Sequence, residues 1–519
     1  MKKIIIAAFL GIIFNSCASI RFKGDPIPVN PNKTVTIDLD ESQKKQWFLL
    51  DLFKDKVPGM SVKRAFSELI KDKEGKEVIV AVIDSGIDIE HTALNSNIWV
   101  NQKEIPENQI DDDKNGYVDD VNGWNFLGDS QNENLEYVRL QKKEENDSSI
   151  YLEYEKKRQK EISEYKNRLS NVNSIKENLS QAKKKLMSLL GTEKIDLEKA
   201  RAINPQTPEL IEAIRVVEFA KDSGINERLI EKALKQYQDA LDYHHNIDFD
   251  GRLIVGDNPD DFEDQNYGNH YVMGPLGSNN DHGTHVAGII AANGVGVAKK
   301  VKIMSIRAVP NGDEYDKDVA LAIRYAVDNG AKIINASFGK SYSPHSNWVH
   351  EAILYAAEKD VLFIHAAGND GNNINLKQYP NFPNDFKEGK EIANNMITVG
   401  ASNWNYSEEL ITTFSNYGDL NVDVFAPGYK IYSTVPNNSY ESFDGTSMAA
   451  PNVSGVAAVL RSFYPRFSAS KIKKIILESG IPMYSKLKVP SEKENHNPYY
   501  YSKTGKLVNL YNALLYASK

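Results

Sequence analysis

Three short segments place a reactive side chain among small residues that let the backbone approach closely: Asp84-Ser85-Gly86, His282-Gly283-Thr284 and Gly445-Thr446-Ser447. Together they supply an acid, a base and a nucleophile. A serine hydroxyl is a poor nucleophile at neutral pH, so it needs an imidazole within hydrogen-bond reach, and that imidazole needs a carboxylate to fix its tautomer. The chain therefore holds the parts of a catalytic triad in the order Asp84, His282, Ser447.

The three segments extend into longer motifs that resemble those of the subtilisin-like serine proteases, the subtilases: VIDSGID at 82–88, HGTHVAG at 282–288 and GTSMAAP at 445–451. The resemblance covers most of about residues 45–130 and 248–480. It implies that Ser447 attacks the scissile carbonyl, that His282 takes its proton and passes it to the leaving amine, and that Asp84 orients His282. His285, the second histidine of its motif, is expected to be structural.

The resemblance also implies an oxyanion donor and a substrate site. The asparagine of Ala366-Ala367-Gly368-Asn369 is expected to donate its side-chain amide to the tetrahedral intermediate, beside the backbone N–H of Ser447. An Asn beside Gly is otherwise an ordinary turn former. An extended peptide is expected to pair with one chain segment and to place a side chain in a pocket walled by that segment and a second one. These substrate-binding residues are Ser337, Phe338, Gly339, Ala366, Ala367 and Gly368.

Apolar, β-branched runs alternate with helical patterns around these motifs, which predicts parallel strands that are buried on both faces. Strands are expected at 77–83, 301–309, 331–338, 361–367, 396–401 and 422–426, and helices at 283–293, 316–329, 346–359, 446–464 and 468–479. The alternation predicts a doubly wound α/β fold with a mostly parallel, subtilisin-like sheet. Sites in such folds lie beyond the carboxyl ends of the strands.

Residues 130–245 break the alternation, because they are highly charged and helical in composition. Apolar residues from Ile162 to Leu189 recur at steps of three and four, as in a coiled-coil seam. We expect a helical hairpin inserted into a catalytic domain of residues 41–129 and 246–519; two amphipathic helices lying flat on that domain are the alternative. The hairpin is expected to overhang the substrate cleft or to dock a partner.

An acidic loop at 111–120 carries oxygen side chains at alternating positions, with Gly116 where a calcium loop would turn. The expected ligands of a structural calcium ion are Asp111, Asp113, Asn115 and Asp119. A solvated acidic turn is the alternative, since the bidentate glutamate of a helix-loop-helix site is missing. A second acidic group, from Asp248 to Asp264, is expected to be a solvated loop. No cofactor is expected for catalysis.

The N-terminus has the form of a signal peptide, with Lys2 and Lys3 before an apolar run that ends at Phe14. Ser16-Cys17 resembles a bacterial lipoprotein cleavage site, so residues 1–17 are expected to form a lipoprotein signal, with Cys17 lipidated and residues 18–40 as a polar linker. A plain secretory signal is the alternative. The protein is expected in the bacterial cell envelope, anchored on the periplasmic or surface face of the outer membrane, or in the medium. Because Cys17 is the only cysteine, no internal disulfide is expected.

The sequence thus predicts a serine endopeptidase that acts on proteins or peptides in extended conformation. A formal net charge of −9 gives no basic bias toward nucleic acid. The stretch between Cys17 and Asp84 leaves no room for a folding prodomain, so self-activation by prodomain removal is not expected. Two alternatives stay open: a catalytically silent, subtilase-like binding protein of the envelope, and a narrow processing peptidase that matures one partner.

Overall fold

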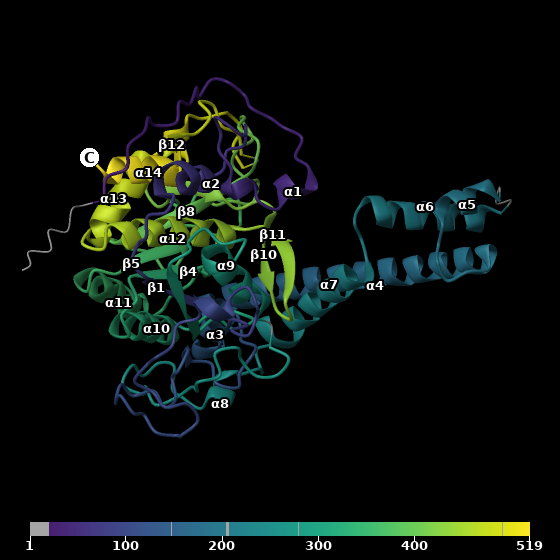
Figure 1. The fold of residues 1–519 in the computed structure, drawn as a ribbon. Coiled ribbons are helices and arrows are strands. Elements are labelled where there is room, and N and C mark those ends of the chain that lie inside the picture. The colour runs from purple at the N-terminus through teal and green to yellow at the C-terminus, as the bar shows by residue number, and fades with distance from the viewer. Residues whose placement is uncertain (1–19, 147, 204–206, 279, 490) are drawn as a thin grey trace, which may run out of the picture.

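The computed structural model describes residues 20–146, 148–203, 207–278, 280–489 and 491–519. Its centre is a nine-stranded sheet in the order β12-β13-β9-β8-β5-β4-β1-β3-β2 (Figure 1). Every neighbouring pair is parallel except β12 with β13. The strands are β1 (Val78–Asp84), β2 (Gly123–Asn125), β3 (Val301–Arg307), β4 (Ile333–Ala336), β5 (Leu362–Ala366), β8 (Met396–Ser402), β9 (Val424–Pro427), β12 (Ile481–Pro482) and β13 (Lys506–Leu507).

Helices cover both faces of this sheet, so the predicted doubly wound α/β fold is confirmed. The alternation of side chains along β1 shows why both faces are apolar: Val80 and Val82 join one core, and Ala81 and Ile83 join the other. The first core holds α9 (Asp281–Ala291), α12 (Thr446–Phe463), α13 (Ala469–Ser479) and α14 (Leu510–Ala517). The second holds α10 (Asp316–Asp328) and α11 (Ser346–Glu358).

The remaining elements are short and lie outside the nine-stranded sheet. Two antiparallel hairpins pair β6 (Phe386–Lys387) with β7 (Lys390–Glu391) and β10 (Ile431–Val435) with β11 (Ser439–Phe443). The short helices are α1 (Glu41–Lys44), α2 (Val62–Arg64), α8 (Arg252–Val255) and five 3₁₀ or π turns, at Trp47–Leu49, Ala65–Ile70, Asn95–Asn97, Ala240–His244 and Pro498–Tyr500.

A helical arm projects from the α/β body between β2 and α9 (Figure 1). It begins with α3 (Glu136–Lys143), which lies against the body (Figure 1), and continues with α4 (Ser149–Leu190), α5 (Leu197–Ala202), α6 (Pro208–Asp222) and α7 (Glu227–Asp239). At 1.5 Å per residue, the 42 residues of α4 span roughly 63 Å. Because α6 and α7 pack along α4, the helices bury their apolar side chains against one another rather than flat on the body.

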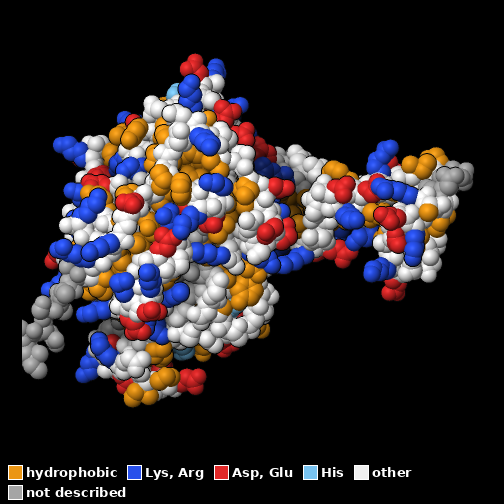
Figure 2. All heavy atoms as spheres, turned by 45° about the horizontal axis from the view of Figure 1, so that its top comes forward, with side chains coloured by type: hydrophobic (Ala, Val, Ile, Leu, Met, Phe, Trp, Pro, Cys, Tyr) orange, Lys and Arg blue, Asp and Glu red, His pale blue; other side chains and the backbone are white. Residues whose placement is uncertain are grey.

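The apolar seam of α4 is buried only in its distal half. Leu179, Ala182 and Leu186 are covered by α6 and α7, whereas Ile175 is 43% exposed. The returning chain is not one helix, because Gly224 adopts a positive φ of 69° and separates α6 from α7. The surface of the arm carries interspersed basic, acidic and hydrophobic side chains (Figure 2).

The N-terminal stretch differs from the expected polar linker. Phe22, Ile27 and Leu39 are buried in the first core, and the ring of Phe22 lies 5.5 Å from that of Phe463. Apolar side chains spaced along a polar stretch bind it to the body as a strap. Cys17 and the rest of residues 1–19 lie outside the described residues.

One residue of the second acidic group departs from the expected solvated loop. Four other members are exposed and lie outside the helices and strands, as expected: Asp248, Asp250, Asp260 and Asp261. The side chain of Asp257, in contrast, is fully buried and forms ion pairs with Arg252 and with Lys317, the latter at 2.7 Å. Its burial depends on these two cations, which the spacing of the acidic residues does not indicate.

Candidate active site

The acid and the base meet where β1 ends and α9 begins. The carboxylate Oδ1 of Asp84 lies 2.7 Å from Nδ1 of His282 and also accepts the backbone N–H of Ser85. Asp84 is 1% exposed, whereas the side chain of His282 is 38% exposed. Burial opposes protonation of His282, but the charge and hydrogen bond of Asp84 raise its pKa above the ordinary value.

This approach needs a glycine after the histidine. A Cβ at Gly283 would lie 2.1 Å from the backbone oxygen of Gly86, so a side chain there would push α9 away from the end of β1. The small residues noted in the motifs thus let the base come within hydrogen-bond distance of the acid.

Ser447 is the second residue of α12 and is partly exposed. Its Oγ donates to the backbone oxygen of Ser337 at 3.0 Å. Among the contacts of the described residues, Ser447 makes no hydrogen bond to His282, so the structure joins acid and base but leaves the link from base to nucleophile unmade. Catalytic hydrogen bonds are often long or misaligned in the absence of substrate.

A proline later in α12 explains how the first turn around Ser447 is held. Pro451 has no N–H, so the carbonyl of Ser447, four residues earlier, has no helical donor. The hydroxyl of Ser337 donates to that carbonyl at 2.9 Å. Ser337 in turn accepts from Asn335, which accepts from Ser454 of α12. This buried polar chain ties the turn that bears Ser447 to β4.

Asn369 lies just beyond β5, and its amide is oriented by one neighbour. Its Oδ1 accepts from the backbone N–H of Thr446 at 2.9 Å and from the hydroxyl of Thr446 at 3.0 Å. The Nδ2 group is thereby turned the other way. A Cβ at Gly445 would lie 3.5 Å from the backbone N of Ser447 and 3.6 Å from Nδ2 of Asn369. Both nitrogens therefore border the space that Gly445 leaves open at the positive end of α12.

A cavity of about 410 Å³ opens beside Ser447 and Asn369. Of the six predicted substrate-binding residues, Phe338, Gly339, Ala366 and Gly368 line it. Ser337 and Ala367 do not line the cavity, because both are buried. Their backbone oxygens instead accept hydrogen bonds, from Ser447 in the case of Ser337 and from two asparagine side chains in the case of Ala367.

The far side of this cavity is built by the helical arm. Tyr137 of α3 and Lys157 and Glu161 of α4 line it. The hydroxyl of Tyr137 donates to Glu161 at 2.7 Å, and the Lys157 ammonium lies 4.3 Å from the centre of the Tyr137 ring. The arm thus begins as part of the pocket wall.

Two supporting residues were missed by reasoning from sequence. His365 holds the wall through its Nε2, 2.9 Å from the oxygen of Phe338, and burial lowers its pKa to about 4, so the neutral ring donates there. Asn416 donates to the oxygen of Ala367 and accepts from two backbone N–H groups of the following turn. No local motif marks either residue; only their contacts do.

His285 is buried and lies apart from the acid–base pair. Its ring stacks on Phe443 at 4.2 Å, and its Nε2 lies 3.1 Å from the backbone oxygen of Glu441. Burial lowers its pKa to about 3, so the ring is neutral at physiological pH. Its position agrees with a structural role.

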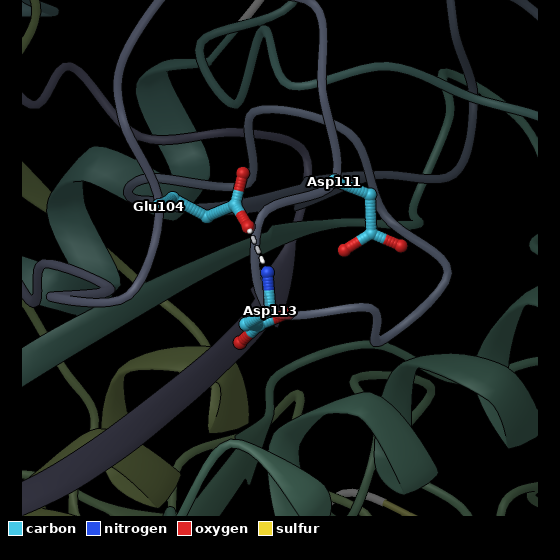
Figure 3. Close-up of side chains that lie close together, drawn as sticks. All are labelled: Glu104, Asp111 and Asp113. Carbon is cyan, nitrogen blue, oxygen red and sulfur yellow. Dashed lines mark hydrogen bonds between the residues drawn. The ribbon is translucent and has the colours of Figure 1, made fainter.

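The acidic loop gathers a carboxylate set that differs from the predicted one. Glu104, Asp111 and Asp113 come within 4.8 Å of one another, and Glu104 accepts the backbone N–H of Asp113 (Figure 3). Asn115 instead donates to Asp120, and Asp119 accepts from Asn108 and Gln109. Glu104 was missed because it lies outside the loop whose spacing suggested a cation.

The family assignment rests on comparison as well as on geometry. A model of the subtilase family matches residues 75–499, which is well over half of the chain. The chain therefore belongs to the subtilase family.

Three relatives illustrate the similarity. The chain is 39% identical over 229 residues to a thermophilic serine proteinase of Bacillus sp. (strain AK1), covering 43% of this chain and 50% of that protein. It is 40% identical over 204 residues to thermitase of Thermoactinomyces vulgaris, covering 38% and 66%. It is 36% identical over 202 residues to subtilisin DY of Bacillus licheniformis, covering 37% and 68%. The alignments with the first two relatives thus span about half to two thirds of their lengths.

Proposed function

We propose that this protein is a serine endopeptidase that hydrolyses peptide bonds through an acyl-enzyme on Ser447. The observation that carries the proposal is the 2.7 Å contact between Asp84 and His282, together with the backbone nitrogen of Ser447 and Nδ2 of Asn369, which both border the space that Gly445 leaves open. Similarity to three proteins named as a serine proteinase, thermitase and a subtilisin supports it.

In the proposed mechanism, His282 Nε2 takes the proton of Ser447 as Oγ bonds to the scissile carbonyl carbon. The oxyanion that forms is stabilised by the backbone N–H of Ser447 and by Asn369 Nδ2. Asp84 stabilises the resulting imidazolium, which then protonates the leaving amine as the C–N bond breaks. A water molecule, deprotonated by the same imidazole, releases the carboxylate product and restores Ser447.

A fluorophosphonate probe tests this assignment. It should modify wild-type protein at Ser447, as located by mass spectrometry of the labelled peptide, and should not modify Ser447→Ala. The absence of labelling in folded, calcium-replete wild type would favour the alternative of a catalytically silent binding protein.

A narrow processing role is favoured over general degradation by one observation. Tyr137, Lys157 and Glu161 of the arm close the far side of the cavity beside Ser447. A wall made by an inserted segment restricts which side chains and which folded substrates reach the nucleophile, and the projecting arm offers a surface for docking one partner. Cleavage profiling of a peptide library checks this: a restricted set of products supports a processing role, and broad cleavage argues for general degradation.

We further propose that the acidic loop binds a structural calcium ion through Glu104, Asp111 and Asp113. Three carboxylates gathered within 4.8 Å suit a hard cation, which takes oxygen ligands. Chelation with EGTA should lower the Tm of wild type, and added calcium should restore it. In Glu104→Gln, the difference in Tm between EGTA and added calcium should largely disappear. A wild-type Tm that EGTA does not change would argue for a solvated turn.

For localisation, we propose that Cys17 is lipidated and anchors the protein in the bacterial cell envelope. The support is the signal-like run before Ser16-Cys17, which lies outside the described residues. Among the helices that the structure describes, none is long and apolar enough to cross a membrane. Wild type should partition with membranes and incorporate labelled fatty acid, whereas Cys17→Ser should do neither. Release of the wild type into the medium without label would favour a plain secretory signal.

A further inference from the structure

A second cavity, of about 330 Å³, lies on the acid side of the candidate active site. Ser85, directly after Asp84, and Ser278, shortly before His282, line it from the α/β body. Its opposite wall is α7 of the helical arm, through Lys232, Lys235 and Asp239. The arm therefore contributes to cavities on both sides of the site.

The charges that line this cavity are unbalanced. Lys235 is paired with Asp239 at 2.6 Å, but Lys232 and Arg307 have no carboxylate within 4.0 Å among the described residues. The Lys232 ammonium instead lies 5.0 Å from the centre of the Phe443 ring. Two cations thus face the cavity without a carboxylate partner from the part of the chain that the structure describes.

Arg307 is the more unusual of the two, because it is 2% exposed. Its guanidinium donates to the backbone oxygens of Ser85, Gly128 and Ser130 and to the side chain of Asn125. Burial lowers its pKa to about 10, partly offset by the charge of Asp129, so it stays protonated at neutral pH. A buried cation held by neutral oxygens is a fixed point of positive potential that loses no further hydration when an anion binds nearby.

From this juxtaposition we propose that the cavity is a subsite for an acidic side chain of the peptide substrate, bound between Lys232 and Lys235 of α7 and Arg307 at the end of β3. The proposal rests on the proposed peptidase activity. The ligand is a carboxylate because Lys232 and Arg307 have no carboxylate partner within 4.0 Å among the described residues, and because Ser85 and Ser278 place the cavity beside the segments that carry Asp84 and His282. Arg307 supplies a fixed positive charge, Lys232 pairs with the carboxylate from the arm, and Lys235 adds positive charge beside it while keeping its pair with Asp239.

The test uses internally quenched peptides in which a single Glu is moved through the positions flanking the scissile bond, each compared with its Gln isostere. At one position, wild type should prefer Glu over Gln by roughly threefold to tenfold in kcat/KM, and the preference should fall as salt is raised. In Lys232→Gln/Lys235→Gln, the preference should shrink toward one while hydrolysis of the neutral peptides changes less than about twofold.

A matched control removes the same charge from the arm away from the cavity. Lys184→Gln/Lys185→Gln alters two exposed lysines of α4 and should keep the wild-type preference. Arg307 is not substituted, because its loss would remove the donor of the Ser85 and Ser130 backbone oxygens and would disturb the fold around the cavity. A Glu-to-Gln ratio near one at every position in wild type, or an unchanged ratio in the cavity variant, would overturn the proposal.

A binding measurement separates this proposal from the peptidase assignment. Full-length Ser447→Ala should bind the preferred Glu peptide more tightly than its Gln isostere by a similar factor, as measured by calorimetry, and the difference should vanish when Lys232 and Lys235 are also changed to Gln. If Ser447→Ala binds the Glu and Gln peptides with unequal affinity and wild type does not cleave them, the subsite is supported and the peptidase assignment is contradicted. If the two affinities are equal, only the subsite is contradicted.

Discussion

Around the candidate nucleophile Ser447, two residues orient the side chains that are proposed to contact the substrate. Thr446 takes both contacts of Asn369 Oδ1, so only Nδ2 is left for an oxyanion. Asp84 does the same for His282, because its carboxylate fixes Nδ1 as the protonated nitrogen and leaves Nε2 as the base. The chemistry proposed for Ser447 thus depends on two orienting contacts.

Replacing Asn369 with Ala should lower kcat by roughly 10²- to 10³-fold with little change in KM, because the lost donor acts only on the oxyanion. Steady-state kinetics on a short peptide measures this. Thr446→Val, which removes one of the two contacts on Oδ1, should lower kcat in the same direction by less. An unchanged kcat in Asn369→Ala would remove Asn369 from the oxyanion site.

The pH profile should report the influence of Asp84 on His282. Since the base must be neutral, kcat/KM should rise with pH, and because Asp84 raises the pKa of His282, the midpoint should lie above the ordinary value of about 6.5. In Asp84→Asn, the raising charge is gone, so the midpoint should move to lower pH while the plateau falls by about 10⁴-fold. If the midpoint is the same in Asp84→Asn as in wild type, the group that titrates is not His282 paired with Asp84.

At the scale of the elements, α12 carries Ser447 and is hydrogen-bonded to the residue that follows β4 of the sheet. A proline inside a helix interior normally leaves a carbonyl without a donor, and here that carbonyl belongs to the candidate nucleophile. The hydroxyl of Ser337 fills the gap from β4, whose following residues form the pocket wall. One hydrogen bond thus couples the position of Ser447 to the position of the wall.

Ser337→Ala should therefore destabilise the fold by about 1–3 kcal/mol, because the buried carbonyl of Ser447 loses its donor. The loss, read from urea unfolding, should be smaller in a Pro451→Ala background, where the substituted residue supplies a backbone N–H for the same carbonyl. Equal losses in the two backgrounds would show that Ser337 acts elsewhere.

On the scale of the whole molecule, the C-terminal helix α14 and the projecting arm lie on opposite sides of one α/β body (Figure 1). Residues 20–39 are strapped along the side that carries α12 and α14, through Phe22 against Phe463 and the backbone N–H of Phe22 to Ser518. These contacts bind the described part of the N-terminal stretch to the α/β body.

Phe22→Ala tests the strap. Because Phe22 is 5% exposed in the first core, its truncation should cost about 3–5 kcal/mol of unfolding free energy, measured by denaturant titration. Its exposed neighbour, in the variant Arg21→Ala, should change the stability little. If Phe22→Ala behaves like Arg21→Ala, the stretch is a free linker after all.

The sequence by itself determined the α/β class, the main strands and helices, and the family, because these depend on local periodicity and on short motifs. Tertiary structure alone decided the rest: Glu104 beside Asp111, Asp257 between Arg252 and Lys317, and the arm as a wall of two cavities. These groupings form in loops and between separate elements, and periodicity carries no information about which side chains a fold will bring within a few ångströms there, whether they are near or far along the chain.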